Sequence, residues 1–519
     1  MQPAQRCLRS LNPRQWPGER DPTRWDAHEA TENLEATFLE RFRVALLHSE
    51  GFGDDDDALA VSESAGDSSE EPSPDVYAYN YPMILLSEHS IYPPEHELVL
   101  LQSTFLTKYK QHIFIKTVDL LNSPISSLPP YLQLAISCLS SATSSPEDSS
   151  LYAMGSEMNQ VDVSSSLFVA GVNLWSVMLE VDNREARLVE AVVAASFLAT
   201  YGQMSVGWDN WRKASTILCN AVTISRRLHL TDECSPLFSS SELSNKDMCM
   251  RSALVSYMFL IDTLQATHCG LAANFSAREL FIKMPGSSHQ FRTVYHSLLH
   301  GDQIPQDVRS GEDALLLLTA LLSDIVYAQR CLQLTSFAGN GLSMHTGLKP
   351  RSPFTPLSAA SEFSRLNEAM TAGLSRWERI FDSHVSNDIL ALQCFCKLQL
   401  ICPDTWKLPQ MAGYGETQSN SQGLRPSEPF QVSDKAAALA WQVLDRCHKI
   451  PPGGKLSVWL PVIVFLCALV VWQRLRTQPD PASHYGTLRV LGLFSKEIAE
   501  YHWPCSVEMI RTLDRLMES

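Results

Sequence analysis

The longest apolar run in this chain, from Val458 to Trp472, contains fifteen residues and no polar side chain. A helix that is apolar on every side lies either in the middle of a large domain or in a membrane. Spanning a bilayer takes about 20 apolar residues and rarely fewer than about 17. Pro461 lies near the start of the run, at a position that suits a first helical turn. We therefore predict a buried helix, which other helices must surround, with a membrane span as the alternative.

Helical periodicity dominates from Glu97 onward, and alternating strand-like patterns are scarce. Helices are expected at 98–116, 131–141, 166–181, 186–201, about 210–229, 245–267, 313–335, 359–382, 387–402, 435–448, 457–477, 484–503 and 506–517. No internal repeat of fixed period indicates a tandem helical array. These patterns predict an all-α fold, with a large domain of about a dozen helices.

Charge is distributed very unevenly along the chain. The 519 residues include 41 Lys and Arg against 57 Asp and Glu, a formal net charge of −16. No basic residue lies between Arg43 and Lys108, and this interval contains thirteen acidic residues. We expect a partly helical N-terminal segment at 1–43, a disordered acidic linker at 44–80 and an all-α domain at 81–519. Because the composition lacks the basic excess typical of nucleic-acid binding, direct DNA binding by this chain is not expected.

The acidic linker is a candidate functional segment, because aromatic and aliphatic side chains follow its acidic residues. The acidic residues that carry this prediction are Asp54, Asp55, Asp56, Asp57, Glu70 and Glu71. Tyr77, Tyr79 and Tyr81 follow them. Disordered segments with this mixture can fold into the groove of a partner protein. The two interpretations are an activation segment that contacts a partner and a solvated spacer.

Few patterns point to catalysis or metal binding. Cys394, Cys396 and Cys402 are closely spaced, but helical residues two apart point about 200° away from each other and do not converge on one ion. His268 and Cys269 are adjacent, and adjacency does not create a nucleophile with its base. The thirteen cysteines are scattered through apolar helical patterns, which is typical of reduced intracellular proteins. We predict no catalytic residue, no metal site and no cofactor.

Five segments of the helical region carry a family resemblance, and their order along the chain is the main reason for it. They are Tyr131–Ser141, Leu167–Gly171, Ala191–Gly202, Trp211–Val222 and Arg226–Leu230. In this order they resemble the regulatory domain of fungal-specific transcription factors, which is called the middle homology region. Residues 279–285 are similar to the turn after the next long helix of that domain. Residues 455–476 are similar to the hydrophobic C-terminal helix of members that carry paired zinc fingers.

The resemblance implies a nuclear protein that regulates transcription through a helical regulatory and interaction domain. Its targets could include a metabolic or secondary-metabolite gene cluster. The implied partners are the transcription machinery, a DNA-binding partner protein or a second copy of the chain in a homodimer. Family members bind DNA through N-terminal zinc ligands, whereas this chain has only Cys7 before Cys138. Either the protein reaches DNA through a partner, or the zinc-finger part is missing from this chain, and both interpretations stay open.

Arg226, Arg227 and His229 form the candidate regulatory surface. They lie at the end of a predicted helix, where basic side chains interact favourably with the helix dipole. They can therefore contact a partner, or they can simply complete the end of the helix. A function from a different class is also open, an all-α enzyme or small-molecule-binding protein of secondary metabolism. Its pocket would lie between helices, where sequence spacing does not reveal it.

Overall fold

The computed structural model describes most of the region for which helices are predicted. The described residues are 92–143, 160–181, 188–232, 245–270, 272–340, 359–415, 431–451, 455–477 and 483–518. The predicted segments 1–43 and 44–80, with the six acidic residues of the linker, lie outside them. Nearly all described residues belong to one unit, which comprises His89–Leu179 and Asn183–Ser519.

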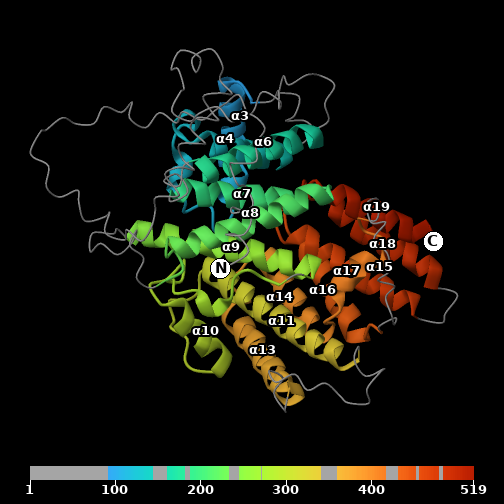
Figure 1. Ribbon diagram of the computed structural model, residues 1–519. Helices are drawn as coiled ribbons and strands as arrows, with labels where there is room; N and C mark the ends of the chain where they lie inside the picture. The colour runs from blue at the N-terminus through green and yellow to red at the C-terminus, as the bar shows by residue number, and fades with distance from the viewer. Residues whose placement is uncertain are drawn as a thin grey trace, which may run out of the picture. The chain divides into compact units, whose positions relative to one another are not determined.

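The regular elements of the described residues are helical (Figure 1), and the prediction of an all-α fold is confirmed. The fifteen α-helices among these residues are α3 (Glu95–Thr107), α4 (Pro130–Thr143), α6 (Gln160–Val181), α7 (Val189–Gln203), α8 (Trp208–Arg227), α9 (Asn245–Cys269), α10 (Phe291–His300), α11 (Gly311–Asn340), α13 (Ala359–Phe381), α14 (Asn387–Ile401), α15 (Leu408–Met411), α16 (Asp434–His448), α17 (Leu460–Arg476), α18 (Ser483–Ala499) and α19 (Cys505–Glu518). Lys283 and Gln290 form the one isolated β-bridge that occurs in this part of the chain.

Helix α7 is the centre of the N-terminal helices, where it packs against α4, α8 and α9. Every residue from Ala191 to Gln203 is buried. Two glycines permit this close packing. A Cβ atom on Gly171 of α6 would lie 2.9 Å from Leu198 Cδ2, and one on Gly202 would lie 2.5 Å from Ala214 Cβ. In Figure 1, α4 and α6 lie above α7, and α8 lies below it.

Helix α17 is the centre of the C-terminal helices and packs against α14, α16, α18 and α19. All residues from Leu460 to Gln473 are buried, and Pro461 lies in the first turn. The prediction of a buried helix for the apolar run is confirmed. None of the helices in the described ranges is long and apolar enough to cross a membrane.

An aromatic cluster joins the helices around α7 to those around α17. The ring of Tyr109 contacts the ring of Trp503 edge-on, with the ring centres 6.0 Å apart. The Tyr109 hydroxyl forms a hydrogen bond with the Tyr257 hydroxyl of α9. The amide of Cys505, the first residue of α19, donates to the Met204 carbonyl at 2.7 Å. The two groups of helices therefore share one core.

One predicted helix is wrong in its second half. The helix expected at 98–116 ends at Thr107 and is followed by the 3-10 turn η5 (Tyr109–Gln111). The Lys110 ammonium is buried in this turn and donates to the Val118 carbonyl at 2.5 Å. The chain leaves the helical path here because the buried ammonium and the Tyr109 hydroxyl each find their partner outside it.

Candidate functional site

The basic end of α8 closes in a Schellman motif, a standard way of ending a helix. The amide of His229 donates to the Arg226 carbonyl at 3.1 Å, and the amide of Leu230 donates to the Ser225 carbonyl at 2.9 Å. His229 has a φ of 52°, in the left-handed region that glycine usually occupies at this position. Leu230 is buried directly after it. The motif turns the chain sharply and leaves the three basic side chains at the surface.

Arg251 of α9 supports this turn from below. Its Nε donates to the Leu230 carbonyl at 2.7 Å, and its Nη2 donates to the carbonyls of His229, at 3.4 Å, and Asp232. Arg251 is buried, and burial lowers the pKa of its guanidinium, an effect that the nearby Asp232 opposes. A buried arginine that donates to backbone carbonyls fixes the path of the chain through residues 229–232.

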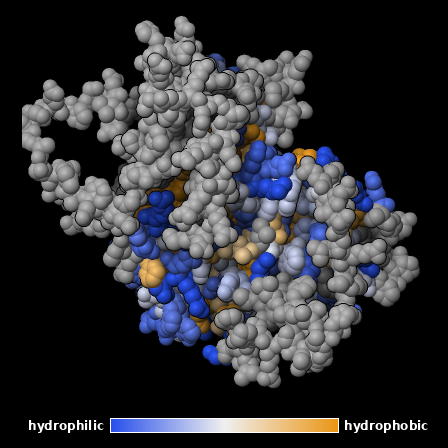
Figure 2. All heavy atoms as spheres, viewed as in Figure 1, coloured by the Kyte–Doolittle hydropathy of each residue, from blue (hydrophilic) through white to orange (hydrophobic). Residues whose placement is uncertain are grey.

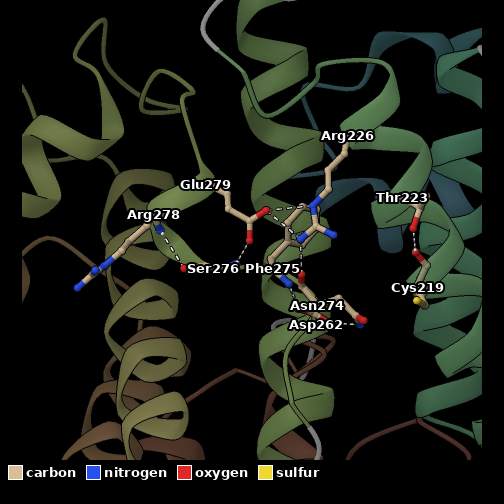
Figure 3. Close-up of polar contacts among 9 residues, drawn as sticks. All are labelled: Cys219, Thr223, Arg226, Asp262, Asn274, Phe275, Ser276, Arg278 and Glu279. Carbon is tan, nitrogen blue, oxygen red and sulfur yellow. Dashed lines mark hydrogen bonds and ion pairs between the residues drawn. The ribbon is translucent and has the colours of Figure 1, made fainter. Parts of the chain in front are cut away.

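Arg226 connects the end of α8 to the segment after α9 (Figure 3). Its Nε lies 3.0 Å and its Nη2 2.8 Å from Glu279 Oε2, and Nη2 also donates to the Asn274 carbonyl at 2.6 Å. The guanidinium carbon lies 5.8 Å from the centre of the Phe275 ring. Arg278 points away from this cluster in Figure 3. A single arginine thus contacts a carboxylate, a carbonyl and an aromatic ring of the same segment.

Glu279 is itself held in place by a capping box with Ser276. Its Oε1 accepts from the Ser276 amide at 3.1 Å, and the Ser276 hydroxyl accepts from the Arg278 amide at 3.3 Å. These bonds begin the 3-10 turn η10 (Ala277–Glu279). One oxygen of the Glu279 carboxylate caps the turn and the other accepts from Arg226. The capping bond therefore orients the carboxylate for its ion pair with Arg226.

Asp262 of α9 binds the same segment, residues 274–275, from its buried side. It accepts from the Asn274 side-chain amide and from the Phe275 backbone amide, both at 2.7 Å. Burial raises the pKa of Asp262 to about 6, although these hydrogen bonds and the charge of Arg226 favour the ionised form. Because this pKa lies above the value of about 3.9 in an unfolded chain, the proton on Asp262 stabilises the fold below about pH 4. That contribution is lost as the pH rises through about 6.

The three residues predicted from sequence are therefore placed differently. The Arg226 guanidinium donates to the Glu279 carboxylate and to the Asn274 carbonyl. His229 lies at the left-handed turn, with its Nδ1 2.7 Å from an oxygen of Asp232, and both side chains are half-exposed. Arg227 is exposed, and its side chain has no ion-pair partner within the described residues. Arg226 and His229 serve the end of the helix, and contact with a partner protein stays a prediction for all three.

Sequence reasoning did not identify Arg251, although a signal for it exists. Arg251 lies three residues before Leu254 and seven before Met258, so it belongs to the apolar face predicted for this helix. A charged residue at such a position needs hydrogen-bond partners inside the fold. The partners at residues 229–232 lie about 20 positions earlier in the chain, where spacing alone does not indicate them.

The cysteines and histidines that could suggest a metal site are not gathered into one. Across the described ranges no group of three or more His, Cys, Asp or Glu side chains is arranged to hold an ion. Cys394, Cys396 and Cys402 are buried thiols, and burial raises the pKa of each, to about 12 for Cys402. Such thiols hold their protons at neutral pH and pack as core residues.

Comparisons with protein-family models, with curated proteins and with solved structures found no match for this chain. The described residues form a large helical domain, in which a polar cluster joins α8, α9 and η10.

The cluster at Arg226 predicts a small but specific effect on stability. Arg226→Ala should lower the free energy of unfolding by about 1 kcal/mol, since it removes partly exposed charged hydrogen bonds. The matched change Arg227→Ala removes the same charge one residue away and should change stability by less than about 0.5 kcal/mol. Urea unfolding followed by circular dichroism measures both variants. Equal losses would contradict the structural role of Arg226.

Proposed function

We propose that this chain is a nuclear transcriptional regulator that acts through its helical domain, a regulatory and interaction domain of the fungal-specific type. The observation that supports this proposal is the packing of the segments that carry the resemblance. They lie on α4, α6, α7 and α8 and on the turn that ends α8, and two of their glycines lie in close contacts between these helices. Gly202 lies against Ala214 and Phe168, and Gly171 lies against Leu198 and Leu134. Motifs inherited from one domain are expected to share a core in this way.

The proposed regulator reaches DNA through a partner protein and influences the transcription machinery. The C-terminal turn of α8 then presents Arg227 and His229 to the partner, because the contacts of Arg226 and Arg251 fix the backbone of this turn. The acidic linker supplies a second contact, through side chains that basic or apolar partner grooves can bind. A metabolic or secondary-metabolite gene cluster is the proposed target.

A reporter assay with the full chain tests this proposal. Fused to a foreign DNA-binding domain, the chain should change reporter transcription relative to that domain alone. Replacing the six acidic residues of the linker with amides should remove the change if the linker recruits the transcription machinery. The matched control replaces six serines of the same segment with alanine: Ser49, Ser62, Ser64, Ser68, Ser69 and Ser73. A folded, nuclear fusion without any effect on the reporter would contradict the proposed function.

A further inference from the structure

A basic pocket lies between the loop after α10 and one side of α13. Its volume is about 290 Å³, close to the lower end of the range for small-molecule sites. Three arginines line it, Arg309 from the loop and Arg376 and Arg379 from α13. The surface over α10 is largely hydrophilic in Figure 2. The pocket therefore offers charged groups from two separate segments around one space.

Backbone carbonyls hold Arg376 in place, and the described residues include no acidic partner for it. Its Nη1 donates to the carbonyls of Leu298 and Leu299, at 2.5 and 2.7 Å, at the C-terminal end of α10. Gly301 follows that end with a φ of 91°, and a Cβ atom there would lie 3.1 Å from Arg376 Nη2. Glycine therefore serves the left-handed turn and the close approach of the guanidinium. These contacts orient Arg376 before any ligand arrives.

The side chains of the other two arginines, Arg309 and Arg379, can bind a ligand in the pocket. Arg379 lies three residues after Arg376, so both project from the same side of α13. Arg309 and Arg379 are exposed, and neither side chain has an ion-pair partner in the described part of the chain. Asp302 also lines the pocket, but its carboxylate is 3.7 Å from His296 Nδ1. The charged lining residues carry a formal charge of +2, in a chain whose net charge is −16.

The remaining lining residues are partly apolar, with Ile304, Pro305 and Ile380 beside the arginines. Arginine forks match the geometry of phosphate oxygens, and three of them around one space suit a dianion better than a single negative charge. The apolar residues suit a ligand that also carries a hydrocarbon part. A site with both features discriminates an organic phosphate from a free ion.

We propose that this pocket binds a small phosphate monoester. Arg309, Arg376 and Arg379 hold the phosphate group, while Ile304, Pro305 and Ile380 contact the organic part. Phosphate binding here depends only on the pocket and its charges, and it is independent of any role in transcription.

Isothermal titration calorimetry with the full chain and phenyl phosphate tests the proposal. We expect saturable binding at one site, with an affinity about tenfold higher than for inorganic phosphate, which lacks the apolar part. Succinate should bind at least about tenfold more weakly than phenyl phosphate. Equal affinities for phenyl phosphate and either of these anions would overturn the assigned ligand class. No saturation by about 10 mM phenyl phosphate would overturn the site itself.

Variants distinguish the pocket from general attraction of anions. The double variant Arg309→Gln with Arg379→Gln should weaken phenyl phosphate binding by at least about tenfold. Neither side chain has an ion-pair partner among the described residues, so the fold should persist, and thermal unfolding checks it. Arg489→Gln with Arg212→Gln removes the same charge from exposed positions on α18 and α8 and should leave the affinity within about twofold. Equal weakening in the two double variants would overturn the proposal.

Two further probes identify the source of the phosphate. A phosphoserine peptide and vesicles that contain phosphatidic acid present the same group on a macromolecule and on a membrane. The pocket is expected to bind phenyl phosphate in preference to both, because its volume of about 290 Å³ suits a small molecule. Tighter binding of the peptide or the vesicles, lost in the Arg309→Gln and Arg379→Gln variant, would overturn the small-molecule assignment.

Discussion

Lys455→Met is expected to lower the free energy of unfolding by about 3–5 kcal/mol. The Lys455 ammonium lies 2.7 Å from Glu497 Oε1 and 2.6 Å from Glu500 Oε2. Only 3% of Lys455 and 4% of Glu497 is exposed. Burial opposes the charged form of Lys455, but hydrogen bonds to the two glutamates hold its pKa above the usual value. The variant leaves Glu497 buried and without its cation, which is the costly state of a broken buried pair.

Urea unfolding followed by circular dichroism measures this loss, and two variants serve as controls. Lys496→Met removes the same charge from an exposed position beside Glu497 and should change stability by less than about 0.5 kcal/mol. The double variant Lys455→Met with Glu497→Met replaces both buried charges with apolar groups and should recover most of the loss. Tyr501 donates to Glu497 at 3.0 Å, and the loss of that bond limits the recovery. Equal losses for Lys455→Met and Lys496→Met would rule out this interpretation.

Gly202→Ala should destabilise the fold by about 2 kcal/mol, even though alanine favours a helix by up to about 1 kcal/mol over glycine. The added Cβ would lie 2.5 Å from Ala214 Cβ and 2.8 Å from the Asn210 carbonyl oxygen. Both atoms belong to α8, and neither can move without moving that helix. The substitution therefore separates α7 from α8 instead of filling a space. The same urea titration measures the change.

Gly492→Ala is the matched control for this substitution. Gly492 lies inside α18, and no described atom beyond the neighbouring helix backbone lies within 4 Å of a Cβ built there. The same chemical change should therefore stabilise the protein by about 0.5–1 kcal/mol, through helix propensity alone. An effect of the same sign at both positions would show that packing between α7 and α8 does not depend on the glycine.

The central helix was predictable because its signal is contained within the helix itself. Fifteen consecutive apolar residues, with Pro461 near their start, indicate a buried helix without any knowledge of its neighbours. Helix α10 was not predicted, although Phe291, Val294, Tyr295 and Leu298 are spaced for one helical face and are all buried. Helix α10 has only 10 residues, and no side chain caps its start. Short helices of this kind depend on packing more than on local signals.

The candidate sites were less predictable, because their partners come from distant parts of the chain. The sequence indicates the basic end of α8, but Glu279 lies 53 positions after Arg226. The pocket brings Arg309, from the loop after α10, close to Arg376 and Arg379 of α13. From residue type alone, each of these four arginines is expected to be an ordinary surface residue. Their convergence depends on the packing of α10 against α13, which only the folded chain provides.

The contact between Met204 and Cys505 has a consequence for how this protein is made. The two residues are 301 positions apart in the chain. At the rates at which ribosomes elongate a chain, this interval takes roughly 15–60 s to synthesise. During that time the end of α7 and the Tyr109 ring stay without Trp503 and Cys505, the groups that later cover them. The newly made N-terminal helices therefore lack part of their apolar cover until the region around residue 505 has been synthesised.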